Sequence, residues 1–182
     1  MRVDSLTGLL EGVRYVASPH CDDRPTDATV DLLVIHGISL PPNQFGGPFI
    51  EALFMGTLDP HAHPYFQQLA GVRVSAHALI RRDGSIIQFV PFTQRAWHAG
   101  QSNFCGRSRC NDFSIGIELE GADHIPYTPE QYASLAEVTQ AILAAFPNIG
   151  WNTIAGHSDI APERKNDPGP TFDWVRYRKA LS

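Results

Sequence analysis

The sequence predicts an α/β fold in a single domain, residues 1–182, with a central mixed β-sheet flanked by helices. Three patterns support this prediction: apolar or alternating runs of strand length at 31–36 and 114–120, a hairpin signal between 76 and 90, and a helical repeat that begins at Thr128. Alternation of strands and helices is typical of parallel strands with helical connections, and the hairpin adds an antiparallel pair.

The first third of the chain contains one clear strand and one short helix. Residues 17–29 (ASPHCDDRPTDAT) are polar and contain proline, so we expect an irregular segment. Residues 31–36 (DLLVIH) are a short apolar run, which predicts a buried strand that ends at His36. Two adjacent prolines indicate that residues 37–47 form a loop, and residues 48–56 (PFIEALFMG) predict a short helix.

The middle of the chain is rich in strands. Residues 76–81 and 85–90 flank an Asp-Gly pair, which is a strong signal for a β-hairpin. Residues 91–113 form a long predicted loop, and such loops are often functional. The run 114–120 (SIGIELE) alternates, so its apolar residues face one way and its polar residues, including Glu118, face the other.

The last third begins with the clearest helix signal. Thr128 is a predicted N-cap, Gln131 completes a capping box, and apolar residues follow at helical spacing as far as Phe146. Residues 155–170 (AGHSDIAPERKNDPGP) predict a loop, and residues 172–181 predict a final short helix.

Composition excludes several classes of protein. Hydrophobic residues make up 43% and charged residues 18%, which is typical of a globular chain. A net charge of −5 without a basic stripe argues against nucleic-acid binding, and no apolar stretch is long enough to predict a membrane span. The opening residues lack the features of a secretory signal, and the cysteines, Cys21, Cys105 and Cys110, are odd in number. We therefore expect free thiols and a reducing, cytoplasmic location.

Two of the eight histidines are candidates for a metal site. His36 ends an apolar strand, and His157 begins a loop rich in charged residues. A hydrolytic zinc site needs three protein ligands and one open position, which two imidazoles and one carboxylate would satisfy. Local reasoning leaves the carboxylate open among Asp159, Glu163 and Asp167. An ordinary structural role is the alternative for each histidine.

Two further residues are candidates for catalysis. Glu118 faces away from the apolar side of its strand, where it would act as a general base if a metal lies opposite. The alternative is a solvated strand face that it shares with Glu120. Lys165 would stabilise an oxyanion, and the alternative is an ordinary loop lysine.

Eight segments, in order along almost the whole chain, match motifs of a known family. They are HCDDRP (20–25), LLVIHGISLPP (32–42), DPHAHPYF (59–66), VSAHALIRRDGSIIQFVPF (74–92), RAWHAG (95–100), CNDFSIGIELEG (110–121), YTPEQY (127–132) and GHSDIAPERKNDPGP (156–170). In these segments the chain resembles the 1,6-anhydro-N-acetylmuramyl-L-alanine amidases of bacterial cell-wall recycling, the AmpD family. This family belongs to a wider group of zinc amidases that includes phage T7 lysozyme and the peptidoglycan recognition proteins.

The resemblance implies a peptidoglycan-recognition/T7-lysozyme-like amidase fold with one Zn²⁺ ion. By position, His36, His157 and Asp167 match the zinc ligands. Glu118 matches the residue that acts as the general base, and Lys165 matches the lysine that stabilises the tetrahedral intermediate.

The resemblance also implies substrate-binding residues. Arg73 and Arg109 match basic positions that bind the acidic stem peptide, and Trp97 and His98 match residues that line the cleft. Gly37 departs from the family pattern, where we expect asparagine, and an amide next to a ligand would orient the ligand or the substrate.

The predicted function is zinc-dependent hydrolysis of the amide bond between the lactyl group of anhydro-N-acetylmuramic acid and L-alanine. The expected partner is a small muropeptide, with no nucleic acid and no membrane, and the expected state is a monomer. Two alternatives are a muropeptide-binding module, which the complete ligand set disfavours, and an envelope amidase acting on intact cell wall. The absent signal and the short C-terminal end disfavour the envelope amidase.

Overall fold

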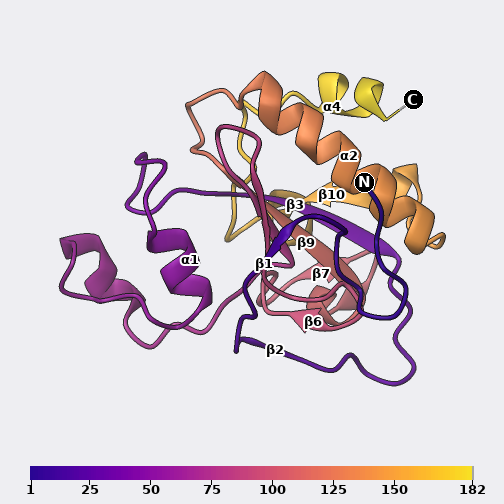
Figure 1. Cartoon of the computed structure of the whole chain (residues 1–182), viewed down its shortest axis with the longest axis horizontal. Helices are drawn as coiled ribbons and strands as arrows, with labels where there is room; N and C mark the ends of the chain where they lie inside the picture. The colour runs from indigo at the N-terminus through magenta and orange to yellow at the C-terminus, as the bar shows by residue number, and fades with distance from the viewer. Residues whose placement is uncertain (182) are drawn as a thin grey trace.

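The structure, a computed structural model, describes residues 1–181 and contains a six-stranded mixed sheet with the strand order β1-β5-β4-β9-β3-β10 (Figure 1). Only the β4–β5 pair is antiparallel within this sheet, which confirms both the mixed sheet and the hairpin. The strands of the sheet are β1 (Arg14–Tyr15), β5 (Ile86–Gln88), β4 (Ala78–Ile80), β9 (Ser114–Glu120), β3 (Leu32–Ile38) and β10 (Ile154–Gly156).

Strands β3 and β9 form the centre of the sheet. They pair in parallel over seven residues each, and His36 is directly opposite Glu118. The prediction that β3 ends at His36 is wrong by two residues, because pairing with β9 continues through Ile38. The main-chain ladder therefore holds His36 inside a strand rather than at its end.

One face of the sheet is covered by helices α2 (Pro129–Ala145) and α4 (Trp174–Ala180), which lie together above the strands in Figure 1. The Thr128 hydroxyl accepts a hydrogen bond from the Gln131 backbone N–H, and the Gln131 side-chain oxygen accepts one from the Thr128 backbone N–H, so the predicted capping box is confirmed. Apolar residues of β3, β4 and β9 pack against α2 and α4 on this face; Ile35 and Ile117 of the sheet and Leu135 of α2 belong to this cluster.

The other face of the sheet carries the long connections. Helix α1 (Phe49–Phe54), which confirms the short helix predicted at 48–56, and the 3-10 turn η1 (Pro64–Leu69) pack near β4 and β5. The loop predicted at 91–113 contains three short strands and one turn: β6 (Arg95–Ala96), β7 (Asn103–Phe104), β8 (Arg107–Ser108) and η2 (Cys110–Asp112). Strand β6 pairs with β2 (Cys21–Asp22), and β7 pairs with β8.

The prediction of a continuous loop at 155–170 is wrong at its start. Residues Ile154–Gly156 form β10, which pairs with β3, and the one-turn helix α3 (His157–Ile160) follows directly after the turn η3 (Trp151–Thr153) and β10. This segment has few apolar residues, so only its pairing with β3 reveals the strand. The consequence is that His157 lies next to the central strands.

Cys21, Cys105 and Cys110 are free thiols, as expected. Within residues 1–181, none of the helices has the length and apolar character needed to cross a membrane.

Candidate metal centre and catalytic site

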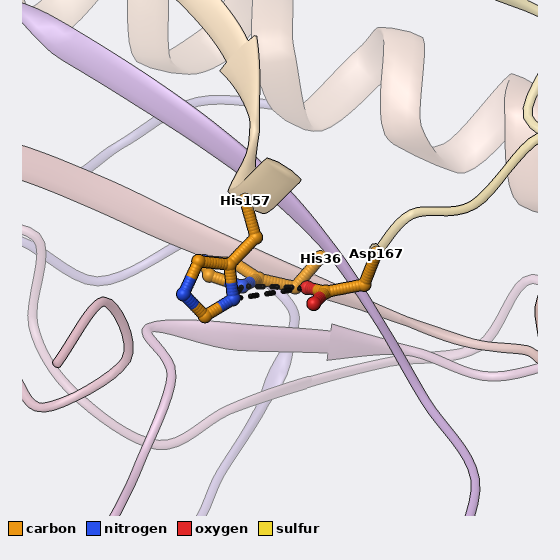
Figure 2. A group of neighbouring side chains, drawn as sticks. All are labelled: His36, His157 and Asp167. Carbon is orange, nitrogen blue, oxygen red and sulfur yellow. Dashed lines mark hydrogen bonds and ion pairs between the residues drawn. The ribbon is translucent and has the colours of Figure 1, made fainter. Parts of the chain in front are cut away.

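Three side chains converge beside the central strands (Figure 2). His36 lies on β3, His157 is the first residue of α3, and Asp167 lies between α3 and α4. His36 Nδ1 lies 3.0 Å from His157 Nδ1, and Asp167 Oδ2 lies 3.2 and 3.1 Å from these two nitrogens. A tetrahedral ion with ligand bonds of about 2.0–2.2 Å separates its ligand atoms by roughly 3.3–3.5 Å, so the three atoms suit one zinc ion.

The structure distinguishes among the three carboxylates that local sequence reasoning leaves as candidates for the third ligand. Asp159 Oδ2 accepts a hydrogen bond from the Gly156 backbone N–H at 2.7 Å, so this carboxylate closes the first turn of α3. Glu163 is exposed and is not part of the His36 group. The backbone carbonyl of Asp167 accepts a hydrogen bond from Ser158 N–H at 2.9 Å, which ties the Asp167 segment to α3.

The charges of these groups suit a metal. Burial lowers the pKa of His36 to about 4, so its imidazole is neutral at pH 7 and offers a lone pair. Burial opposes ionisation of Asp167, but the imidazoles of His157 and His36 outweigh it, lower the pKa of Asp167 and keep it a carboxylate. Two imidazoles and one carboxylate leave a bound dication with net positive charge, which is what polarises a carbonyl.

Each imidazole is oriented through its second nitrogen. His157 Nε2 lies 3.2 Å from the backbone carbonyl of Ala99, which also accepts a hydrogen bond from the Arg164 guanidinium at 2.7 Å. His36 Nε2 lies 2.9 Å from His98 Nδ1. Such contacts set the ring orientation of a metal ligand. Neither the Ala99 carbonyl nor Arg164 was nominated from the sequence, because only the tertiary fold brings them to His157.

Glu118 lies beside this group with an unusual environment. It is the β9 residue in register with His36, and its Oε2 is buried without a hydrogen-bond partner within residues 1–181. Burial, reinforced by the Asp167 carboxylate, raises the pKa of Glu118 well above its ordinary value. Buried carboxylate oxygens normally have partners, so the free Oε2 indicates a group that meets a ligand.

Glu118 is therefore not on a solvated face shared with Glu120. Glu120 is almost fully buried, and its carboxylate accepts hydrogen bonds from the backbone of Gly46 and Arg82 and from the Arg81 side chain. Its acceptor capacity is used by the protein, whereas that of Glu118 is not.

A cavity of about 330 Å³ opens onto the site. Its polar end contains Glu118, Lys165, Asp167, His157 and His98. The Lys165 ammonium is close enough to Glu118 to oppose the rise in its pKa. Most of the other lining side chains are apolar: Leu40, Leu53, Phe54, Leu69, Val72 and Val74. The cavity therefore combines a group of titratable side chains with a largely apolar lining.

Three of the predicted substrate-binding residues lie outside this cavity. The Trp97 indole donates a hydrogen bond to Asp22 at 3.0 Å and stacks on His20, so its ring is used in packing. Arg109 is 70% exposed and pairs with Asp112. Arg73 is exposed and lines a smaller neighbouring cavity that also includes His20. His98, the fourth, lines the main cavity and contacts His36.

Tyr127 is a site neighbour that sequence reasoning missed. Its hydroxyl donates a hydrogen bond at 2.8 Å to the carbonyl of Pro168, the residue after Asp167. A Cβ atom at Gly37 would lie 2.3 Å from the same hydroxyl oxygen. The absence of a side chain at Gly37 therefore leaves room for the contact that ties the Asp167 segment to the start of α2.

Comparisons with known proteins identify the family of the chain. The family model described as N-acetylmuramoyl-L-alanine amidase matches residues 26–170. The 1,6-anhydro-N-acetylmuramyl-L-alanine amidase AmpD of Escherichia coli (strain K12) is 62% identical over 175 residues, 96% of this chain and 95% of the relative. A crystal structure of a selenomethionine AmpD derivative matches with a TM-score of 0.96 at 59% identity, and the match covers 100% of both chains.

A more distant structure carries a substrate. It is the complex of the N-acetylmuramyl-L-alanine amidase AmiD from E. coli with anhydro-N-acetylmuramic acid-L-Ala-D-gamma-Glu-L-Lys. It matches with a TM-score of 0.62 at 29% identity, over 86% of this chain and 60% of that chain. Together these matches confirm the amidase fold expected from the sequence.

Proposed function

Because the chain belongs to the N-acetylmuramoyl-L-alanine amidases, and among them to the 1,6-anhydro-N-acetylmuramyl-L-alanine amidases of the AmpD family, we propose that it uses one zinc ion to cut anhydromuramyl peptides. The bond cleaved joins the lactyl carbonyl of the sugar to the amine of L-alanine. The observation that carries the proposal is the convergence of His36, His157 and Asp167 beside a buried carboxylate without a partner. The whole chain acts as one amidase domain.

Zinc is the metal that the donor set favours. Two imidazole nitrogens and one carboxylate oxygen are typical of catalytic zinc sites, which keep one position open. When bound there, zinc supplies acidification of a water molecule and polarisation of the scissile carbonyl.

The residues of the chain supply the proton transfer and the charge. Glu118 Oε2 accepts the proton of the attacking water, because it is free of other partners and its raised pKa makes it a stronger base than an exposed carboxylate. Glu118 then returns this proton to the departing amine of L-alanine. The Lys165 ammonium, in the same cavity, stabilises negative charge on the carbonyl oxygen.

The substrate extends beyond the cavity. The stem peptide carries acidic carboxylates, and the exposed guanidinium groups of Arg73 and Arg109 offer them opposite charge outside the cavity. We assign these two guanidinium groups to the stem peptide, and His98 to the wall of the cleft. Trp97 supports the rim by packing on His20.

The first experiment separates three functions. The purified protein is incubated with an anhydromuramyl tripeptide and, separately, with intact peptidoglycan, each with and without a chelator. Release of peptide from the small substrate alone, abolished by chelator and restored by zinc, supports the proposal. Cleavage of intact peptidoglycan at a similar rate would indicate an envelope amidase, and binding without cleavage would indicate a recognition module.

The second experiment assigns roles. Glu118→Gln keeps the size of the side chain but removes the proton acceptor, so turnover falls by roughly 10²–10⁴-fold while zinc content stays at the wild-type value. His157→Ala loses zinc, which metal analysis of the purified variant measures. Glu163→Gln, an exposed carboxylate on the same segment as Lys165, is the matched control and keeps both activity and zinc. Near-normal turnover of Glu118→Gln refutes the assignment of the base.

We also propose a monomer that acts in the cytoplasm on muropeptides and binds neither nucleic acid nor membranes. The net charge of −5 is consistent with an enzyme that does not bind nucleic acid. Light scattering after gel filtration tests the oligomeric state, and immunodetection in fractionated cells tests the location.

A further inference from the structure

A chain of hydrogen bonds runs from the backbone to the proposed metal ligand His36. The Ser114 hydroxyl donates to the carbonyl of Cys110, with the two oxygens 2.6 Å apart. Ser114 Oγ also lies 3.1 Å from His98 Nε2, and His98 Nδ1 lies 2.9 Å from His36 Nε2. Three contacts of hydrogen-bond length therefore connect the Cys110 carbonyl to the imidazole of His36.

The donor and acceptor in each of these hydrogen bonds follow from the chemistry of the groups. A carbonyl oxygen only accepts, so the single hydroxyl proton of Ser114 is used on Cys110, and Ser114 Oγ must accept from His98 Nε2–H. A neutral imidazole carries one N–H, so His98 Nδ1 is then a bare acceptor. It faces His36 Nε2, which must carry a proton to donate to it.

We propose that His98 is a positioning residue that, together with Ser114, selects the tautomer of His36 that can bind metal. With its proton on Nε2, His36 presents the Nδ1 lone pair to the point where His157 and Asp167 converge. This inference rests on the proposed function, because it concerns the same metal site.

We call the hydrogen-bonded series Cys110–Ser114–His98–His36 the relay. It matters because a second tautomer of His36 is also compatible with the neighbouring groups. Its Nδ1 lies 3.2 Å from Asp167 Oδ2, so the other tautomer would donate Nδ1–H to that carboxylate. In that form, the nitrogen aimed at the site has no lone pair for a metal. A bare His98 Nδ1 stabilises the Nε2–H tautomer and thus disfavours the competing one.

The strand β9 is built to hold the relay. Ser114, Gly116 and Glu118 are alternate residues, so they share one face of the strand. A Cβ atom at Gly116 would lie 2.4 Å from Cγ and Nδ1 of His98. Glycine at this position therefore leaves the space that the His98 ring occupies, in contact with the hydroxyl of Ser114 and the ring of His36.

The two histidine ligands differ in how they are oriented. His157 Nε2 faces the Ala99 carbonyl directly, and a carbonyl can only accept, so its tautomer is set in one step. His36 is separated from the Cys110 carbonyl by two side chains, and either of them can be changed by mutation. The relay is therefore open to experiment in a way that the Ala99 contact is not.

Zinc affinity tests the relay without measuring catalysis. Metal-free protein competes with a chromophoric chelator for zinc. His98→Leu fills the space but removes both nitrogens, so we expect affinity to fall by roughly 10–100-fold. His98→Asn places an amide oxygen near the position of Nδ1, so it recovers most of this loss. Ser114→Ala weakens binding, because His98 can then adopt the tautomer that opposes His36.

A matched control is available in the same loop. Ser102 is also a buried serine whose hydroxyl contacts Cys110, but it accepts from the Cys110 backbone N–H at 3.1 Å and does not contact His98. Ser102→Ala therefore leaves zinc affinity unchanged. Equal losses in Ser102→Ala and Ser114→Ala would mean that the loop, and not the relay, sets affinity, and the proposal would be overturned.

Nitrogen NMR of the imidazoles shows which ring nitrogen of each histidine carries the proton. In the metal-free protein, we expect His98 to carry its proton on Nε2, and Ser114→Ala to add the Nδ1–H form. A wild-type His98 with its proton on Nδ1 overturns the inference. A wild-type protein that binds no zinc overturns the proposed function and this inference with it, whereas normal zinc binding by His98→Leu overturns the relay alone.

Discussion

One added methyl group at Gly116 offers a direct test of the geometry around His98. In Gly116→Ala, the new Cβ would lie 2.4 Å from two ring atoms of His98, whereas ordinary contact begins at 3.4 Å. The backbone of β9 is paired with β3 on one side and with β4 on the other, so the strand is held and the ring must move. The required shift is the difference between these distances, about 1 Å.

The magnitude follows from this shift. Movement of His98 Nδ1 by about 1 Å stretches its 2.9 Å contact with His36 Nε2 beyond hydrogen-bond length. Overpacking in a well-ordered core costs about 1–3 kcal/mol, and a buried N–H left unpaired costs about 1–3 kcal/mol. We expect the free energy of unfolding to fall by about 2–6 kcal/mol, a large share of the total for most domains.

Equilibrium unfolding in urea, on metal-free protein, measures this change. The control is Gly150→Ala, because an added methyl there meets no atom within 4 Å and Gly150 has φ −113°, which alanine accepts. If Gly116→Ala unfolds within about 0.5 kcal/mol of the wild type, as an ordinary surface substitution does, the His98 ring does not pack on β9 and the reasoning is refuted.

Three further predictions concern the stability of the fold. Thr128→Ala removes the cap of α2, so the free energy of unfolding falls by about 1–2 kcal/mol in urea, while Thr128→Ser retains most of it; equal values for the two variants would contradict the capping role. Burial lowers the pKa of His77 to about 3, below its unfolded value, so its contribution to stability is complete above pH 6.5 and declines as the pH falls. When the pH falls from 7.5 to 5.5, the free energy of unfolding of the metal-free wild type should decrease by about 1.4 kcal/mol more than that of His77→Asn. If the free energies of unfolding of the two proteins change in parallel with pH, the buried imidazole is not neutral. Zinc at 100 times its dissociation constant should stabilise the fold by about 2.7 kcal/mol, which calorimetry detects as a rise in melting temperature of roughly 5–10 °C, and His157→Ala should show no rise.

The sequence predicts those elements whose formation depends on neighbouring residues alone. The capping box at Thr128 and Gln131 and the Asp-Gly hairpin need only neighbouring residues, and both are confirmed. Strand β10 has three residues and no alternation of its own, so its pairing with β3 defines it. The prediction of a loop there missed it for that reason.

The site residues also divide into those that local sequence indicates and those that it does not. His36 and Glu118 were nominated because they stand out on their strands, whereas the choice of Asp167 over Asp159 depended on the family resemblance. The structure supplies the physical basis for this choice, since Asp159 caps α3 while Asp167 meets the two histidines. Hydrogen bonds across long sequence separations, such as that between Tyr127 and Pro168, have no sequence pattern that would reveal them.

The parallel register of His36 with Glu118 has a consequence for how such an enzyme can change. Neighbouring strands lie about 4.8 Å apart wherever they pair, so the main chain fixes the distance between the proposed ligand and the proposed base. The surrounding connections contribute the cavity walls and the exposed arginines, and their lengths do not enter this measurement. Insertions or exchanges in those connections can therefore redirect the enzyme to other wall fragments while the spacing of the reactive groups stays constant.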